Sequence, residues 1–270
     1  MSQAPAPQVV MATDDARIAT YDVGDPAAPA ILAVHGFASS AQVNWFATGW
    51  VRELTRAGFR VIAIDQRGHG RSDKPHDPAA YSMQQLVADV AAVLDAYLLD
   101  EVGLVGYSLG ARVGWHAALG TEHRILKAVL GGIPDGLPLT RFRVDQALAH
   151  LERGAEVDDR ITRAYLDMAA RTPDNDLAAL VALVGGLQGG LQPDPSAPPR
   201  QPVLFATGSE DGIIAASRRL AAATPSGEFF EIPGRNHFNA PTARPFRDRA
   251  LAFLGPAPQR TPEVEAAARR

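Results

Sequence analysis

Cysteine is absent from the 270 residues of this chain. A chain without thiols has no disulfides, no cysteine nucleophile and no zinc–thiolate site. An excess of basic residues is absent too: Lys and Arg total 26 against 30 Asp and Glu, which gives a formal net charge of −4. Because nucleic-acid binding depends on basic side chains that neutralise phosphates, we expect no nucleic-acid partner.

Long apolar runs are also missing. No stretch of the chain approaches the roughly 20 apolar residues that a membrane-spanning helix needs. The first ten residues, MSQAPAPQVV, lack the basic start and apolar centre of a secretory signal. We therefore expect a cytoplasmic protein with no membrane partner. Apolar residues nevertheless make up 46% of the chain, which is enough for a sizeable core.

The apolar residues gather in short runs that predict buried strands. These runs lie at 30–34, 60–64, 102–106, 126–130, 202–206 and 228–232. Continuous rather than alternating runs are typical of strands covered on both faces, as in a parallel sheet. Helical spacing fills the intervals, at 44–57, 82–99, 109–120, 215–223 and 243–254. This alternation predicts a three-layer α/β fold, and residues 9–24 add a predicted antiparallel hairpin.

One interval, residues 134–200, breaks this alternation. It contains no strand-like run, and its helical spacing predicts helices around 141–153, 159–170 and 176–184. Its last part, 185–200, is rich in Gly and Pro and predicts a flexible return to the core. We interpret 134–200 as a helical cap inserted into a core formed by 1–133 and 201–255. Residues 256–270, rich in Pro, Ala and charge, predict a loose tail.

The motif with the clearest chemistry is GYSLG at 106–110. It matches G-x-S-x-G, with Ser108 flanked by Gly106 and Gly110. The turn from strand to helix in this motif is so sharp that a Cβ at either glycine would meet neighbouring backbone, and the nucleophile itself is strained. The free N–H groups at the start of the following helix favour negative charge. An apolar run precedes the motif and a helical segment follows it, so we predict that Ser108 is a nucleophile.

A serine hydroxyl is a poor nucleophile without a base. His237 lies in the loop PGRNHFNAP after the last predicted strand, where open α/β sheets place their sites. The base in turn needs a carboxylate that orients it. Asp211 follows the predicted strand 202–206 and is our choice, while Glu210 beside it and Asp135 after the preceding strand are the alternatives.

The negative charge that develops on an attacked carbonyl needs two backbone donors. Leu109, directly after the predicted nucleophile, supplies one N–H. The other is expected from Phe37, because Gly36 lets the loop after the first buried strand bend close to the site. Two further histidines, His35 and His69, are expected to hold this loop and the loop after the second strand.

Taken together, these motifs resemble the α/β-hydrolase superfamily. The resemblance rests on HGF at 35–37, DQRGHGRSDKP at 65–75, GYSLG at 106–110, GSEDG at 208–212 and GRNHF at 234–238. It implies an eight-stranded, mostly parallel sheet flanked by helices, with a small helical cap between the sixth and seventh strands. The order Ser108, Asp211, His237 is the order that this family uses. The resemblance also implies that Asp65, Arg67 and Ser72 stabilise the loop beside the site.

The resemblance and the residues together predict acyl transfer to water. Haloalkane dehalogenases and epoxide hydrolases of this superfamily carry an Asp where this chain has Ser108, and a serine suits acyl carbon instead. We expect a carboxylic ester hydrolase that acts through an acyl-enzyme, with no metal and no organic cofactor. Three alternatives stay open: a hydrolase of carbon–carbon bonds or enol-lactones, a cofactor-free perhydrolase, and a ligand-binding protein that retains the triad.

Substrate choice is weakly encoded. The insertion is mostly apolar, which predicts an apolar pocket for a small-molecule substrate with a small to medium acyl group. Candidate lining residues are Trp45, Tyr107, Phe142 and Ile213, of which Trp45 could equally be a core anchor. No Lys or Arg is obviously placed to bind a phosphate or a carboxylate.

Overall fold

The computed structural model describes residues 3–121, 123–136 and 139–255. Within them the strands are β1 (Gln8–Met11), β2 (Arg17–Val23), β3 (Ala30–Val34), β4 (Arg60–Ile64), β5 (Val102–Tyr107), β6 (Ile125–Gly131), β7 (Val203–Gly208) and β8 (Gly227–Ile232). The helices are α1 (Trp50–Arg56), α2 (Met83–Ala96), α3 (Leu109–Gly120), α4 (Val144–Arg153), α5 (Arg160–Arg171), α6 (Leu177–Leu187), α7 (Ile214–Ala223) and α8 (Arg244–Leu254). The tail predicted at 256–270 lies outside the described residues.

The strands form one sheet in the order β1-β2-β4-β3-β5-β6-β7-β8. β1 and β2 are antiparallel to each other, and β2 is antiparallel to β4. Every other neighbouring pair is parallel. The predicted hairpin and the predicted mostly parallel eight-stranded sheet are both confirmed. The apolar runs predicted these strands because the central strands are covered on both faces. Strand β3, for example, is buried at all five positions and therefore needs a continuous apolar run.

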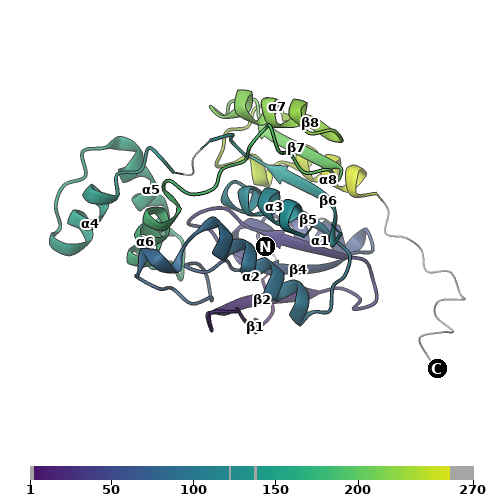
Figure 1. Cartoon of the computed structure of the whole chain (residues 1–270), viewed down its shortest axis with the longest axis horizontal. Helices are drawn as coiled ribbons and strands as arrows, with labels where there is room; N and C mark the ends of the chain where they lie inside the picture. The colour runs from purple at the N-terminus through teal and green to yellow at the C-terminus, as the bar shows by residue number, and fades with distance from the viewer. Residues whose placement is uncertain (1–2, 122, 137–138, 256–270) are drawn as a thin grey trace, which may run out of the picture.

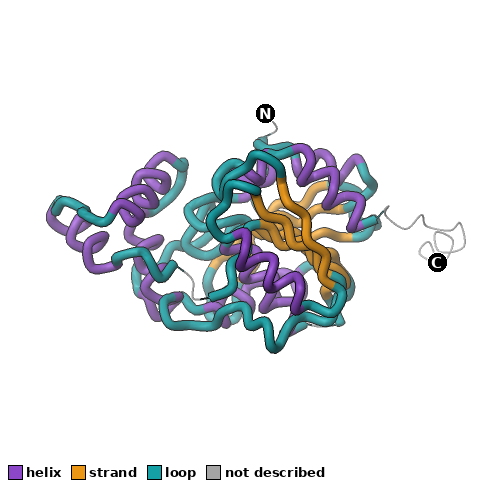
Figure 2. The backbone as a smooth tube through the Cα atoms, turned by 90° about the horizontal axis from the view of Figure 1, so that it is seen from above, coloured by secondary structure: helices purple, strands orange, loops and turns teal. Residues whose placement is uncertain are grey.

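Helices cover both faces of the sheet (Figures 1 and 2). On one face α2, α3 and α7 pack in a cluster with inward side chains of the strands, such as Leu104 and Leu130. On the other face α1 and α8 pack around Trp50 and Phe246, whose ring centroids lie 4.8 Å apart. The three layers therefore have two separate apolar cores, one on each side of the strands.

The predicted helix over 44–57 is two helices. A π-helix, η1 (Gln42–Phe46), comes first, and α1 begins only at Trp50. Gly49 between them has φ 85°, a left-handed conformation that interrupts a helix and that glycine adopts without steric strain. The spacing of apolar residues identified the buried side of both helices and did not predict the break between them.

The segment between β6 and β7 carries α4, α5 and α6, which stand to one side of the sheet (Figure 1). Helix α6 runs on through Gly185 and Gly186, which the composition had assigned to a loop. A Cβ at Gly186 would collide with the backbone oxygens of Pro78 and Tyr81. Gly186 therefore allows α6 to approach the core closely, and its presence there reflects packing rather than a turn.

Candidate functional site

Ser108 lies at the junction of β5 and α3. Its backbone has φ 52° and ψ −111°, a conformation that a residue with a side chain rarely adopts. Its N–H donates to the Gly131 oxygen at the end of β6, over 2.8 Å. The neighbouring strand therefore holds the turn, and the hydroxyl is placed above the carboxyl edge of the sheet.

The glycines on either side of Ser108 are required by contact. A Cβ at Gly106 would collide with the backbone of Gly110, and a Cβ at Gly110 would collide with the backbone oxygens of Val34 and His35. The nucleophile turn and the end of β3 therefore touch through backbone atoms alone. This is the physical reason that the sequence motif needs glycine at both positions.

Ser108, His237 and Asp211 form a continuous hydrogen-bonded array. His237 Nε2 lies 2.9 Å from Ser108 Oγ, and His237 Nδ1 lies 2.8 Å from Asp211 Oδ2. A carboxylate only accepts hydrogen bonds, so Nδ1 carries the proton and Nε2 is free to accept from the serine. Asp211 is 5% exposed, and its other oxygen accepts the Ile213 N–H over 3.2 Å. The arrangement is that of a base poised to take a proton from a hydroxyl.

The two alternative acids are placed elsewhere. Both Asp135 oxygens accept from Arg219, over 2.7 and 2.9 Å. Glu210 is exposed. Asp211 is the carboxylate in contact with the imidazole because its position after β7 faces the loop that carries His237.

The loop after β3 lies against the nucleophile. A Cβ at Gly36 would lie 3.4 Å from Ser108 Cβ, and the Gly36 N–H is held by Asn44 Oδ1 over 3.2 Å. Within the described residues, the Phe37 N–H donates to no acceptor, and the Leu109 N–H at the start of α3 has no partner either. The two expected donors therefore belong to backbone segments that meet at Ser108.

Two buried histidines hold this loop, as the sequence predicted. His35 Nδ1 donates to the Gly36 oxygen over 2.7 Å, and His35 Nε2 accepts the Gln66 N–H over 3.1 Å. His69 Nδ1 donates to the Arg67 oxygen over 3.1 Å, and His69 Nε2 accepts the Ala38 N–H over 3.0 Å. Burial lowers the pKa of both imidazoles, so each is neutral and acts as donor and acceptor at once.

The motif at 65–75 has the structural role that the resemblance implied. Asp65 accepts from the Tyr21 hydroxyl over 2.8 Å and from the Ala41 N–H over 2.7 Å. Arg67, which is fully buried, donates to Asp89 and to Asp14. The Ser72 hydroxyl donates to the Asp65 oxygen over 2.6 Å. These contacts position the loop that supports His69.

The residues named as pocket candidates have different locations. Tyr107 is buried, and its hydroxyl donates to the His237 backbone oxygen over 2.6 Å, so it supports the histidine loop. Ile213 is half-buried beside Asp211. Phe142 is 3% exposed in the apolar centre of the insertion. Trp45 is 1% exposed and packs on Trp50 in the core. For Trp45 the interpretation as a pocket wall was wrong, because η1 directs the side chain under the sheet.

Besides apolar packing on Phe37 and Ala38, the insertion reaches the loop after β3 through Tyr165 and Asn175. The Tyr165 ring of α5 lies 5.7 Å from the Phe37 ring and 6.4 Å from the Phe238 ring, measured between centroids. Asn175, between α5 and α6, donates from Nδ2 to the Ala38 oxygen over 3.0 Å. Ala38 has φ 54°, so a strained residue is held from both sides, by His69 at its N–H and by Asn175 at its oxygen.

Sequence reasoning missed Arg112, which lies one helical turn after Ser108 on α3. It is 5% exposed, although no carboxylate lies within ion-pair distance of it in the described chain. The search of the sequence for a Lys or Arg placed to bind a phosphate or a carboxylate did not single out this residue. A signal was present in LGARVGWHAAL, where a single cation interrupts an otherwise apolar helix.

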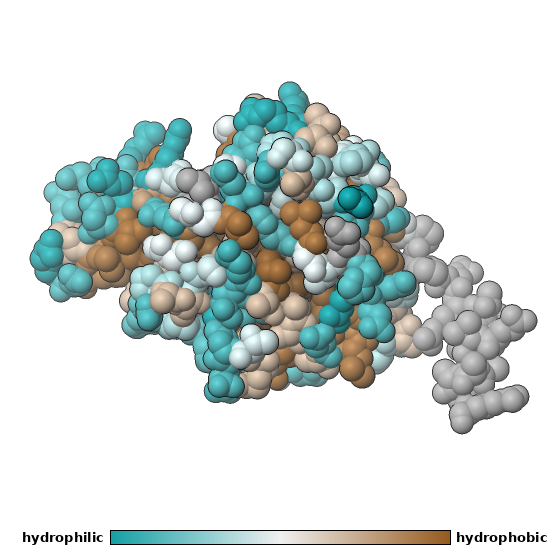
Figure 3. All heavy atoms as spheres, viewed as in Figure 1, coloured by the Kyte–Doolittle hydropathy of each residue, from teal (hydrophilic) through white to brown (hydrophobic). Residues whose placement is uncertain are grey.

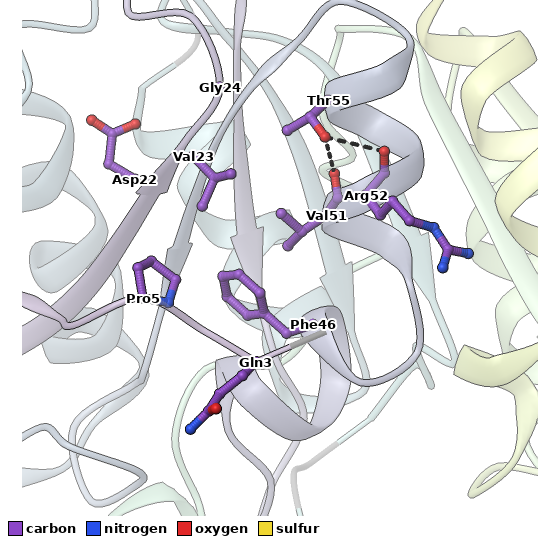
Figure 4. Close-up of a pocket in the computed structure, with 9 residues that line it drawn as sticks. All are labelled: Gln3, Pro5, Asp22, Val23, Gly24, Phe46, Val51, Arg52 and Thr55. Atoms are coloured by element: carbon purple, nitrogen blue, oxygen red, sulfur yellow. Dashed lines mark hydrogen bonds between the residues drawn. The ribbon is translucent and has the colours of Figure 1, made fainter. Parts of the chain in front are cut away.

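Other parts of the described chain offer no competing site. Residues 3–255, with the gaps given above, contain no cluster of three or more acidic or histidine side chains able to hold a metal. None of the described helices has the length and apolar character needed to cross a bilayer. A surface hollow between the N-terminal segment and α1 contains Asp22, Phe46 and Thr55 but no residue of the Ser108 array (Figure 4).

Comparison with known proteins agrees with this fold. A family model described as alpha/beta hydrolase fold matches residues 29–155. The enol-lactonase from Burkholderia xenovorans LB400 superposes with a TM-score of 0.75, covering 92% of this chain and 99% of that structure at 22% identity. The chain is an alpha/beta hydrolase-fold protein. A structure from work on carboxylesterases of Nitrososphaera gargenis gives a TM-score of 0.76 at 17% identity, with 92% of this chain and 97% of that chain covered.

Among curated sequences, this alpha/beta hydrolase-fold protein is similar to epoxide hydrolases. It is 42% identical over 94 residues to epoxide hydrolase B of Mycobacterium tuberculosis, which is 34% of this chain and 25% of that protein. The chain spans between a quarter and just under half of the length of several curated relatives that it matches. The likeness to that relative therefore concerns about a third of this chain.

Proposed function

We propose that this protein is a serine hydrolase that cleaves a carboxylic ester or a related acyl compound. The observation that carries the proposal is the array in which Ser108 Oγ, His237 and Asp211 are joined by contacts of 2.9 and 2.8 Å. Nucleophilic acyl transfer needs an activated nucleophile and backbone donors for the developing negative charge at one place. The hydrogen-bonded array, the strained serine and the adjacent free N–H groups would supply them.

In the proposed first half-reaction, Ser108 Oγ attacks the substrate carbonyl and His237 Nε2 takes the hydroxyl proton. Asp211 keeps the imidazole in the tautomer that accepts at Nε2 and stabilises the imidazolium that forms. The carbonyl oxygen becomes negative, and the N–H groups of Phe37 and Leu109 donate to it. His237 then gives its proton to the leaving alkoxide, which departs and leaves an acyl-enzyme.

In the second half-reaction, water replaces the alcohol. His237 takes a proton from the water, whose oxygen attacks the acyl carbon. When the tetrahedral intermediate collapses, the proton returns to Ser108 Oγ and the carboxylic acid is released. The sequence of steps uses side chains and backbone of this chain together with water, so it calls for no metal and no organic cofactor.

The helices α4–α6 are proposed to act as a cap that selects the substrate, as part of an insertion over 134–200. Supporting this role, α5 brings Tyr165 against Phe37, whose N–H is one proposed donor. In the space-filling view, apolar atoms continue from the insertion lobe to the adjoining part of the core (Figure 3). A small-molecule substrate with a small to medium, mostly apolar acyl group fits this surrounding.

Epoxide hydrolysis is a second candidate, because the curated relative quoted above carries that name. Opening an epoxide by covalent catalysis requires attack on saturated carbon and an intermediate that water can cleave. A carboxylate nucleophile gives an ester, which is cleaved readily, whereas Ser108 would give an ether, which is not. The serine therefore favours acyl substrates. Hydrolysis of enol-lactones, hydrolysis of carbon–carbon bonds and perhydrolysis would use the same three residues, so these reactions stay as alternatives.

The proposal is tested by turnover and by labelling. We expect hydrolysis of p-nitrophenyl butyrate and an adduct of a fluorophosphonate on Ser108, detected by mass spectrometry of the digested protein. Ser108→Ala should lower kcat by about 10⁴-fold or more while the melting temperature changes little. Ser217, a buried serine outside the array, is the matched position for the digest and should carry no adduct. Absence of turnover with no labelled Ser108 would contradict the proposal, and turnover of styrene oxide instead would favour the second candidate.

Chain length tests the proposed acyl preference. Burial of each added CH₂ against an apolar wall contributes about 0.8 kcal/mol, so kcat/KM should rise severalfold per carbon until the pocket is full. We expect a maximum at short or medium acyl chains across p-nitrophenyl esters from acetate to palmitate. A flat profile or a maximum at palmitate would show that no small apolar pocket limits the acyl group.

A further inference from the structure

Arg112 is a buried cation whose charge has no carboxylate partner. It lies on α3, and its backbone N–H donates to the Ser108 oxygen over 3.1 Å, which places it one turn beyond the proposed nucleophile. Helical side chains lean toward the N-terminus of the helix, so this side chain lies over the turn that carries Ser108. Only 5% of the residue is exposed.

Most N–H donors of the Arg112 guanidinium have no hydrogen-bond acceptor within the described residues. Nη1 donates to the Gly136 oxygen over 2.6 Å, and within the described residues Nε and Nη2 donate to no acceptor. The carboxylate whose charge acts on it, Asp135, is held by Arg219 over 2.7 and 2.9 Å. Burial lowers the pKa of the Arg112 guanidinium to about 10, which leaves it charged at neutral pH.

Arg67 shows what the fold provides when a buried arginine is structural. Arg67 is as buried as Arg112, and its guanidinium donates to both oxygens of Asp89, to Asp14 and to the Ala80 oxygen. Buried charges are nearly always paired, because desolvation penalises a charge that has no counter-ion. Arg112 departs from this pattern at a position beside the proposed site.

The surroundings of Arg112 border the reacting groups. Gly136, whose oxygen accepts from Arg112, lies four residues after Gly132 in the segment that follows β6. A Cβ at Gly132 would lie 3.2 Å from His237 Cε1, so this segment passes beside the histidine. Tyr165 approaches from the insertion, and the charges of both Asp211 and Arg112 act on its hydroxyl. Arg112 follows Ser108 by one turn of α3, and Tyr165 packs on Phe238, the neighbour of His237, so both residues lie beside the proposed reacting groups.

We propose that Arg112 binds a carboxylate carried by the substrate, so that the substrate class is acyl compounds with a free acid group. This inference rests on the proposed function. A planar carboxylate matches the donor fork of a guanidinium and supplies the missing counter-charge. A dianion such as a phosphate fits less well, because a single guanidinium supplies only one positive charge.

Two esters of equal chain length test the proposal. The p-nitrophenyl monoester of glutaric acid ends in a carboxylate, and p-nitrophenyl pentanoate ends in a methyl group. We expect wild-type kcat/KM to be higher for the glutarate monoester, and Arg112→Gln to lower the ratio of the two kcat/KM values by about 30-fold, the loss expected for a hydrogen bond to a charged group. Arg112→Lys, which keeps the charge and loses the fork, should lower it less.

Arg171→Gln is the charge-matched control, because Arg171 is an exposed arginine of the insertion. Its ratio should equal the wild-type ratio. An equal loss on both esters in Arg112→Gln would make Arg112 a structural residue and overturn the proposal. If Arg112→Gln does not fold, the wild-type comparison decides: equal kcat/KM values for the two esters overturn the proposal, and a preference for the acid that Arg112→Lys reduces supports it.

Calorimetric titration with glutarate separates this inference from the proposed function. We expect glutarate to bind wild type and Arg171→Gln at least about 30-fold more tightly than Arg112→Gln, whether or not either ester is hydrolysed. Labelling of Ser108 and ester turnover without any Arg112-dependent selectivity would overturn this inference alone. Absence of both labelling and turnover, with Arg112-dependent glutarate binding, would overturn the proposed function alone.

Discussion

The rim of the sheet and the inserted helices hold their residues in different ways. At the rim, β3, β5 and α3 meet through backbone atoms, and glycines at 106 and 110 leave no space for a side chain. Helix α6 of the insertion also touches core backbone, at Gly186, but the turn 172–176 before it meets the core through side chains: Asn175 bonds to Ala38, and the pairs His76–Asp176 and Arg71–Asp174 lie at 2.8 and 3.3 Å. Backbone contact fixes a geometry, whereas these pairs leave it adjustable.

The energies follow the same division. Arg71 and His76 are more than half exposed, and exposed ion pairs contribute about 0–1 kcal/mol each. Overpacking at a glycine in the rim costs about 1–3 kcal/mol and sometimes more. The comparison teaches that the proposed nucleophile lies where backbone contacts leave no space for a side chain, while the turn that joins the insertion to the core is held by weaker contacts. Four experiments test this division.

The largest effect is expected from the carboxylate behind His237. Asp211→Asn should lower kcat by about 10²- to 10⁴-fold, because the amide favours the imidazole tautomer that cannot accept from Ser108. Asp135→Asn, the matched change one strand away, should affect kcat far less, since Asp135 pairs with Arg219. Steady-state kinetics on one ester decide between them. A greater loss in Asp135→Asn would place the working carboxylate after β6.

The next effect concerns the backbone contact at the rim. Gly110→Ala should lower the free energy of unfolding by about 3 kcal/mol or more, because the new Cβ collides with the backbone of β3. Gly120→Ala at the other end of α3 is the control. There the nearest atom is Val87 Cγ1 at 3.9 Å, so stability should rise by up to about 1 kcal/mol. Urea denaturation measures both, and equal values would show that the rim tolerates a side chain.

A smaller effect is expected from pH. Burial lowers the folded-state pKa of His35 and His69 below the ordinary value of 6.5, so between that value and the lower folded pKa only the unfolded chain binds the proton. The free energy of unfolding should therefore fall as the pH drops below about 6.5, by at most about 1.4 kcal/mol per pH unit for each histidine.

His69→Gln keeps an acceptor for the Ala38 N–H and removes one titrating group. Its stability should fall less steeply with acidification than that of wild type, measured by urea denaturation between pH 7 and 5. The exposed His76, changed to Gln, is the control and should leave the slope unchanged. An identical slope in His69→Gln would mean that His69 is protonated in the folded protein.

The smallest effect is expected where the insertion touches the rim. Asn175→Ala removes the donor to the Ala38 oxygen and should lower kcat by about 5- to 10-fold with little change in KM, because one hydrogen bond positions the strained residue after Phe37. His76→Ala removes a different contact between insertion and core and should leave kcat within about twofold. A change in KM alone would assign Asn175 to the attachment of the insertion rather than to the loop.

Much of the fold could be read from local pattern, and the misses have a common cause. The strands and α2, α3, α7 and α8 coincide with apolar runs or helical spacing. Local pattern did not predict the helix break at Gly49 or the helical conformation of residues 185–186. Both depend on how the surrounding segments pack. The role of Trp45 was equally ambiguous, since local sequence does not distinguish an aromatic side chain that lines a pocket from one that is buried in the core.

By itself, the sequence predicted the groups that the proposed chemistry uses. The G-x-S-x-G spacing, the Gly36–Phe37 turn and the loop positions of Asp211 and His237 are local properties, and local properties follow from sequence. The tertiary structure alone decided which carboxylate faces the imidazole, because Asp211 and Asp135 follow neighbouring strands and differ only in what lies opposite them. It also decided that Arg112 is buried without a counter-charge, since burial depends on how α3, the segment after β6 and α5 pack together.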